Sequence, residues 1–201
     1  MISYVLKHPH CVEPVEEAKP VPSGHEVLVR IKNVGICGSD IHLFHGTYNG
    51  PHAYPMKFGH EWSGVVEATG ELVTSVKPGD LVTGDCSRFC GSCPACENDR
   101  NLCSHIEKFG ITVDGSSTEY ILRDEKYLYK SPAGMDEKLL ALTEPVAVAA
   151  HLLRHGVAAD RAGAGIDRNE GSQRHIPDAH QRCAGEEDAR HEHQPAQHAP
   201  C

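Results

Sequence analysis

Apolar and polar residues alternate most clearly over residues 26–34, a stretch that is rich in β-branched side chains. In an extended chain, Val27, Val29 and Ile31 lie on one face, while the charged Arg30 lies on the other. This period of two residues predicts a half-buried β-strand over residues 26–34.

Other parts of the chain repeat this pattern over shorter lengths. The 201 residues include 19 glycines and 13 prolines, which favours many short strands joined by turns. We therefore expect a mainly β fold. The further predicted strands are residues 64–68, 81–83, 120–122 and 127–129.

The apolar period lengthens after residue 136, which predicts helices at the end of the folded region. The three leucines of residues 139–142 suit a short helix. Residues 144–155 suit a longer helix, with Pro145 in its first turn and Gly156 as its C-terminal stop.

Residues 159–201 differ in composition from the rest of the chain. Their only large apolar residues are Ile166 and Ile176. A segment with so few apolar side chains cannot offset its conformational entropy by burial. We therefore expect residues 1–158 to form one domain and residues 159–201 to be a disordered tail.

The charge of the chain narrows the functions that it can have. Its net charge is −9, from 19 Lys and Arg against 28 Asp and Glu. Without a basic field, binding to nucleic acid or to an anionic membrane surface is not expected. No stretch reaches the about 18 to 20 apolar residues of a membrane span, so we predict a cytoplasmic protein.

A cluster of cysteines is the strongest local signal of chemistry. Cys90, Cys93, Cys96 and Cys103 are close enough in sequence to surround one tetrahedral ion, and zinc binds readily to four cysteines. Four protein ligands leave no position for substrate, which predicts a structural zinc site. The alternatives are a loop with incidental cysteines and an iron–sulfur cluster, which usually has other spacings.

A second, more dispersed set of metal ligands follows or precedes predicted strands. Cys37, His60 and Glu61 offer a thiolate, an imidazole and a carboxylate. Three protein ligands leave a position open, as a catalytic zinc requires. Adjacent side chains of a regular strand point to opposite faces. Glu61 therefore binds the same ion as His60 if the backbone turns there, and otherwise supports the site from outside the ligand shell.

Five motifs in order resemble those of the zinc-dependent medium-chain alcohol dehydrogenases, especially the polyol (sorbitol-like) and threonine dehydrogenase-like branch. They are GICGSDIHLFHG, FGHEWSG, VKPGD, CGSCPACENDRNLC and LTEPVAVAAH, and the resemblance covers residues 1–157. It implies a GroES-like β-barrel catalytic domain with C-terminal helices. In the family, a Rossmann domain that binds NAD or NADP follows. The resemblance also implies a small alcohol or polyol as substrate and a homo-oligomeric assembly.

The resemblance also implies which residues bind zinc. By the family pattern, Cys37 and His60 bind the catalytic ion together with Glu61 or Glu144, and the four clustered cysteines bind the structural ion. Glu144 replaces the cysteine of animal and plant alcohol dehydrogenases, which favours the polyol branch.

Three residues near Cys37 are candidates for proton transfer and positioning. Ser39 is placed to accept the proton of the substrate hydroxyl, and His42 to pass it to solvent through the cofactor ribose. Asp40 is placed to orient His60 by accepting its second ring proton. The alternatives are a turn or N-cap role for Ser39 and Asp40, and a surface histidine at His42.

The end of the chain departs from the family pattern. Gly163 and Gly165 have the spacing of a dinucleotide-binding turn, but Arg168 stands where the third glycine is expected. We therefore expect the dinucleotide-binding domain to be absent. All nine lysines lie at or before Lys138, and this abrupt change in usage suggests a reading frame lost near residue 159.

Two functions stay open at this point. The first is a zinc-dependent alcohol or polyol dehydrogenase that transfers hydride to NAD(P), carried by a truncated chain. The second is a non-catalytic zinc-binding GroES-like module or pseudoenzyme fragment.

Overall fold

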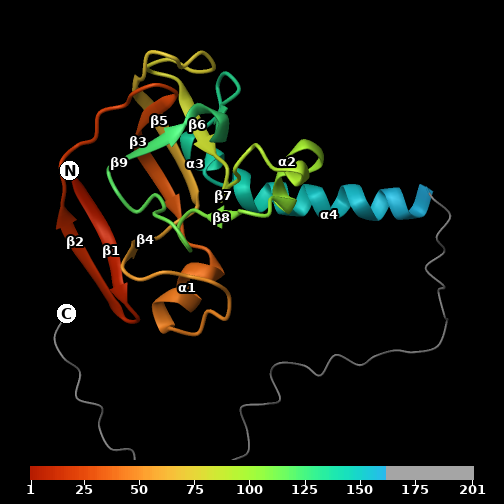
Figure 1. Ribbon diagram of the computed structural model, residues 1–201, viewed down its shortest axis with the longest axis horizontal. Helices are drawn as coiled ribbons and strands as arrows, with labels where there is room; N and C mark the ends of the chain where they lie inside the picture. Colours follow the sequence, from red (N-terminus) through yellow and green to blue (C-terminus); the bar gives the residue numbers. More distant parts are fainter. Residues whose placement is uncertain (162–201) are drawn as a thin grey trace, which may run out of the picture. The chain divides into compact units, whose positions relative to one another are not determined.

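Antiparallel strands dominate the computed structural model, which describes residues 1–161 (Figure 1). Residues Met1–His151 form one compact unit. The strands are β1 (Ile2–His8), β2 (Cys11–Glu16), β3 (Glu26–Gly35), β4 (Met56–Lys57), β5 (Glu61–Thr69), β6 (Leu81–Gly84), β7 (Ser87–Arg88), β8 (Glu107–Lys108), β9 (Tyr120–Asp124) and β10 (Leu128–Lys130). The α-helices are α1 (Gly38–His45), α2 (Pro94–Asn98), α3 (Glu137–Leu140) and α4 (Thr143–Arg161), and the 3-10 helices are η1 (Arg100–Leu102) and η2 (Glu125–Tyr127). The predicted mainly β fold is confirmed.

Strand β3 lies inside a five-stranded antiparallel sheet with the order β10-β6-β5-β3-β9. It pairs with β5 on one side and with β9 on the other. Val27 and Val29 are fully buried and Arg30 is exposed, as predicted. Leu28 is also buried, so the alternation begins only at Val29. The other predicted strands belong to the same sheet, except that Tyr127 ends η2 and β10 begins one residue later.

The main core covers one face of this sheet. Trp62 of β5 is almost completely buried among aliphatic side chains from neighbouring strands. Burying side chains of this size stabilises a fold by about 1.5 to 3 kcal/mol each. The buried members of this core are Val27, Val29, Trp62, Val66, Val76, Val82, Ile121 and Leu128.

The alternation of residues did not predict the hairpin of β1 and β2. In β1, the chain buries Ser3 and Val5 and exposes Ile2 and Tyr4, so a polar residue faces inward and two large apolar residues face outward. The buried Ser3 hydroxyl lies 2.8 Å from the hydroxyl oxygen of Thr118. Backbone hydrogen bonds from β1 to the residues just before β9 join the hairpin to the five-stranded sheet, in keeping with the expected barrel.

The two C-terminal helices form where they were expected, but α4 does not stop at Gly156. It continues to Arg161, because one glycine inside a helix costs only about 1 kcal/mol relative to alanine. Residues 159–161, which were expected to be disordered, are therefore helical, and residues 162–201 lie outside the described part of the chain. Among the helices of residues 1–161, none combines the length and the apolar character needed to cross a membrane.

The carboxylate of Glu125 connects three segments at one end of the main sheet. One oxygen lies 2.8 Å from His25 Nδ1. The other accepts hydrogen bonds from the backbone of Thr74 and Ser75 and from the Ser75 hydroxyl. The hydrogen bond with His25, followed by those from Thr74 and Ser75, lowers the pKa of Glu125 to about 2 from its usual 4.5.

We expect Glu125→Gln to destabilise the fold in a pH-dependent manner. A carboxylate with a lowered pKa contributes stability that is complete above its unfolded pKa of 4.5 and is lost as the pH falls toward 2. The difference in urea midpoint between wild type and variant should therefore be largest near neutral pH and shrink below pH 4.5. The same substitution at the exposed Glu16 is the control, and an equal effect at both positions would contradict the assignment.

Candidate functional site

The pairing of β3 with β5 brings the dispersed metal ligands together. Gly35, the last residue of β3, lies opposite Glu61, the first residue of β5. Cys37 follows β3 after one intervening residue, and His60 directly precedes β5. One ligand atom from each of Cys37, His60 and Glu61 lies within 4.8 Å of the others. The predicted group of three donors is therefore assembled in the structure.

A turn at Gly59 allows His60 and Glu61 to reach the same place. Gly59 has a φ of +83°, a left-handed conformation that favours glycine. A Cβ atom at this position would also lie 2.7 Å from Val34 Cγ1. Because His60 lies between this turn and the first residue of the strand, its side chain does not follow the alternation of β5. His60 and Glu61 are both buried.

Gly35 leaves the space that the Glu61 carboxylate occupies. A Cβ atom at Gly35 would lie 2.5 Å from Glu61 Oε2 and 3.0 Å from Glu61 Cβ. A larger residue at position 35 would therefore displace the carboxylate from the group of donors. The contact explains why glycine ends β3, and the sequence motif alone did not reveal it.

Asp40 holds the two halves of the site together. Its buried carboxylate accepts hydrogen bonds from the backbone N–H of Cys37 at 2.9 Å and from that of Gly59 at 3.3 Å. Cys37 is the N-cap of α1, and Asp40 lies in the first turn of this helix. The carboxylate lies 4.0 Å from His60 Nδ1, which is too long for the expected hydrogen bond. Asp40 thus positions the backbone beside both ligands and does not orient the His60 ring through a direct hydrogen bond.

Two buried polar atoms near this site have no hydrogen-bond partner in the described chain. They are Ser39 Oγ and His60 Nδ1. Burial of an unpaired polar group costs about 1 to 3 kcal/mol, so such atoms mark places where a ligand or ion completes the structure. Ser39 and His42 are three residues apart on α1 and therefore lie on one face of the helix. His42 is exposed, and its Nδ1 lies 2.9 Å from the hydroxyl oxygen of Thr47.

Glu144 lies outside the group formed by Cys37, His60 and Glu61. It belongs to the first turn of α4 and is half-buried. Its carboxylate interacts with the thiol of Cys86. Burial raises the pKa of the Cys86 thiol, and the negative charge of Glu144 raises it further.

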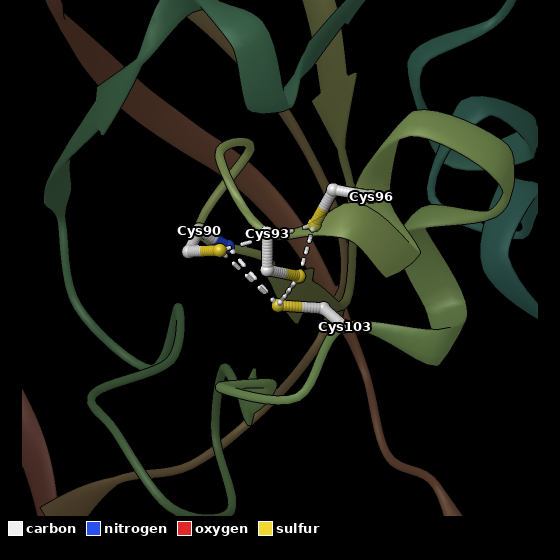
Figure 2. Close-up of side chains that lie close together, drawn as sticks. All are labelled: Cys90, Cys93, Cys96 and Cys103. Atoms are coloured by element: carbon white, nitrogen blue, oxygen red, sulfur yellow. Dashed lines mark hydrogen bonds between the residues drawn. The ribbon is translucent and has the colours of Figure 1, made fainter.

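The four clustered cysteines point their sulfur atoms toward one another (Figure 2). The Sγ atoms are 3.5 Å apart for Cys93 and Cys96, 3.6 Å for Cys90 and Cys103, 3.9 Å for Cys90 and Cys96, and 4.0 Å for Cys93 and Cys103. Zn–S bonds of about 2.3 Å in a tetrahedron place sulfur atoms about 3.8 Å apart. The spacing therefore fits one tetrahedral ion at the centre of the cluster.

Backbone N–H groups and burial act on these thiols in opposite directions. Hydrogen bonds from the Ser92 backbone and hydroxyl lower the pKa of Cys90, and the Ser104 backbone lowers that of Cys93. Burial raises the pKa of Cys96. Four thiolates this close repel one another, so a central cation is needed for all of them to ionise.

A small aromatic core packs against the cysteine cluster. Phe89 and Phe109 each pack edge to face against Tyr127, whose hydroxyl donates a hydrogen bond to the backbone oxygen of Phe89 at 2.7 Å. The buried Cys93 and Cys103 belong to this core. Around this core, residues 87–108 form the two-stranded sheet of β7 and β8 and the short helices α2 and η1, which offer little apolar surface of their own.

Comparison with known proteins places most of the described chain in one family of domains. The model of the alcohol dehydrogenase GroES-like domain matches residues 23–133. Sorbitol dehydrogenase of Halalkalibacterium halodurans is 41% identical over 140 residues, which make up 69% of this chain and 40% of that protein. The chain therefore spans about 40% of the length of this relative.

Solved structures give the same result. Galactitol-1-phosphate dehydrogenase from Escherichia coli superposes with a TM-score of 0.70 at 33% identity, covering 75% of this chain and 44% of that one. A protein described as a zinc-binding dehydrogenase from Sinorhizobium meliloti 1021, bound to NADP, gives a TM-score of 0.63 at 34% identity, covering 70% and 41% of the two chains.

We expect Asp40→Asn to destabilise the fold by about 1 to 3 kcal/mol. An asparagine side chain has one acceptor oxygen and one NH2 group. The backbone N–H of either Cys37 or Gly59 would therefore face this NH2 group and lose its buried hydrogen bond. Urea unfolding measures the loss. Asp99→Asn is the matched control, because Asp99 is exposed and uses one oxygen to accept the hydrogen bond from Asn101 N, which asparagine can also do. Equal midpoints for Asp40→Asn and wild type would contradict this role.

Proposed function

Because this chain belongs to the family of alcohol dehydrogenase GroES-like domains, we propose that residues 1–158 form the zinc-binding catalytic domain of an alcohol or polyol dehydrogenase. The observation that carries the proposal is the convergence of Cys37, His60 and Glu61 within 4.8 Å, beside the unpartnered Ser39 hydroxyl. Family membership and the GroES-like fold agree with what the sequence motifs predicted.

The donor chemistry of this group fits a catalytic zinc. One thiolate and one carboxylate balance the charge of Zn²⁺, and the buried Nδ1 of His60 has no hydrogen-bond partner among the described residues. Three protein ligands leave a fourth position open for a substrate oxygen. The four clustered cysteines fit a second zinc whose coordination is complete, so its role is structural.

Glu144 is the remaining candidate ligand of the catalytic zinc. Its interaction with Cys86 in the structure favours Glu61 as the carboxylate of the donor group. Cys86 belongs to no predicted site, and in the structure its thiol interacts with Glu144.

The chain's own residues supply a route for the substrate proton. Zinc bound at Cys37, His60 and Glu61 would supply a Lewis acid that lowers the pKa of the substrate hydroxyl. Ser39 accepts that proton and releases its own toward His42, on the same face of α1. His42 is exposed and returns the proton to solvent. NAD or NADP would supply the nicotinamide ring that accepts the hydrogen of the alcohol carbon as hydride.

The relatives suggest the classes of substrate and cofactor. Sorbitol dehydrogenase and galactitol-1-phosphate dehydrogenase are named for polyols, and one related structure is bound to NADP. We therefore propose a secondary or primary hydroxyl of a polyol or polyol phosphate as substrate and NAD(P) as hydride acceptor.

A non-catalytic zinc-binding module is the second candidate. The observation in its favour is the group of four cysteines, which fits a zinc ion with no open position for substrate. A module would keep both metal sites and transfer no hydride.

A zinc count and an activity assay separate these two functions. We expect the full chain to bind about two zinc ions and Cys37→Ser to bind about one, because only the open site loses a ligand. Reduction of NAD(P) by sorbitol should fall by more than about 100-fold in Cys37→Ser, since several kcal/mol of transition-state stabilisation are lost. Histidines outside the site are unchanged between the two proteins, so the difference in zinc reports this site alone.

Two zinc ions without reduction of NAD(P) would instead identify the module. An equal zinc content in wild type and Cys37→Ser would contradict the catalytic site itself. Cys86→Ser is the control for loss of a thiol outside the donor group.

We expect removal of metal to destabilise the protein through the cysteine cluster. An ion present at about 1,000 times its Kd stabilises by about 4 kcal/mol, which corresponds to about 8 to 16 °C in Tm for a chain of this size. A chelator should therefore lower the Tm of wild type and of Cys86→Ser by a similar amount. In Cys93→Ser the starting Tm should already be lower than in wild type, and the chelator should lower it by less than in wild type, because only the three-ligand site is left to lose its ion. An unchanged Tm of wild type in chelator would contradict a structural zinc.

A further inference from the structure

The last turn of α1 holds His42 next to Thr47, a residue that no motif identified. The helix ends at Gly46, which has a left-handed φ of 68°. The chain then turns back, and Thr47 N donates to the backbone oxygen of His42 at 2.9 Å. This backbone hydrogen bond places the Thr47 side chain beside the imidazole, with Oγ1 at 2.9 Å from His42 Nδ1.

The Thr47 hydroxyl also has an acceptor for its own proton within reach. Thr47 Oγ1 lies 3.5 Å from the backbone oxygen of His42, which can only accept a hydrogen bond. A hydroxyl carries one proton, so a threonine that donates to this carbonyl must accept from the imidazole. His42 Nδ1 is then the donor.

We propose that Thr47 is a positioning residue that holds His42 in the Nδ1–H tautomer. In a neutral imidazole, one nitrogen carries the proton and the other accepts, and the hydrogen bond at the first decides which. With Nδ1 protonated, Nε2 keeps its lone pair and is the nitrogen that accepts a proton.

The catalytic meaning of this tautomer rests on the proposed function. When Ser39 accepts the substrate proton, its own proton passes toward His42, where Nε2 receives it and the ring becomes an imidazolium. The imidazolium then loses the Nε2 proton to solvent and returns to the starting tautomer. Thr47 accepts a hydrogen bond throughout and transfers no proton itself.

Two substitutions at Thr47 separate the effect of its side-chain oxygen from the effect of its shape. Thr47→Val keeps the β-branched shape and the backbone hydrogen bond to His42 but removes the acceptor oxygen, while Thr47→Ser keeps the oxygen. The nitrogen and carbon-bound proton resonances of a histidine ring distinguish its two neutral tautomers. His42→Gln identifies the signals of His42 among those of the 15 histidines by their loss.

Two other histidines provide internal references in the same spectra. His8 Nδ1 lies 3.0 Å from the backbone oxygen of Pro9, and His52 Nδ1 lies 2.8 Å from that of Gly50. A carbonyl oxygen only accepts, so both rings carry the proton on Nδ1 when neutral. Spectra are recorded on the full chain at about pH 8.5, well above the ordinary histidine pKa of about 6.5.

We expect the wild-type His42 ring to give the Nδ1–H pattern of these references. In Thr47→Val the ratio of tautomers should shift about 2- to 10-fold toward Nε2–H, the effect of one net hydrogen bond. Thr47→Ser should restore the wild-type pattern. A wild-type ring with the Nε2–H pattern, or a Thr47→Val variant with an unchanged pattern, would overturn the proposal.

These measurements do not depend on turnover. A chain that binds no zinc or reduces no NAD(P) contradicts the proposed function, while the ring nitrogens of His42 still report whether Thr47 fixes the tautomer.

Discussion

The antiparallel register of β3 and β5 is the constraint on which the candidate site depends. It places Gly35 opposite Glu61, and thereby sets the turn that carries Cys37 beside the turn that carries His60. Both strands are anchored in the main core through buried residues such as Val29 and Trp62. Because a shift of register by one residue moves side chains to the other face of a sheet, the packing of this core also determines which donors meet.

Two turns beyond the paired strands are held together by one buried carboxylate. Asp40 accepts a hydrogen bond from the backbone on each side, at Cys37 and at Gly59. The arrangement leaves His60 Nδ1 without a hydrogen bond to Asp40, at a distance of 4.0 Å. The four clustered cysteines lie in a part of the chain that has only a small aromatic core. An ion bound by their sulfur atoms would add stability that this core does not supply.

Sequence patterns predicted the features that depend on nearby residues and missed those that depend on the tertiary fold. The cysteine cluster and the strand of residues 26–34 were predicted because their signals are local. The strand β1 was missed because its buried face includes Ser3, whose partner Thr118 is far away in sequence. His60 and Glu61 reach the same place because the backbone turns at Gly59. From the sequence, such a turn was one of two alternatives, the other being a Glu61 outside the ligand shell.

Different faces of helix α1 carry residues with different surroundings. Its N-terminus presents Cys37 toward the donor group, and its buried side carries Asp40 and Leu43 into the structure. Ser39 and His42 lie on a third face, one with a buried hydroxyl and the other exposed. In the proposed mechanism, a proton that leaves the substrate moves from the buried Ser39 hydroxyl to the exposed His42. The left-handed Gly46 that ends the helix is followed by Thr47, so the same turn that closes α1 also places a hydroxyl beside the His42 imidazole.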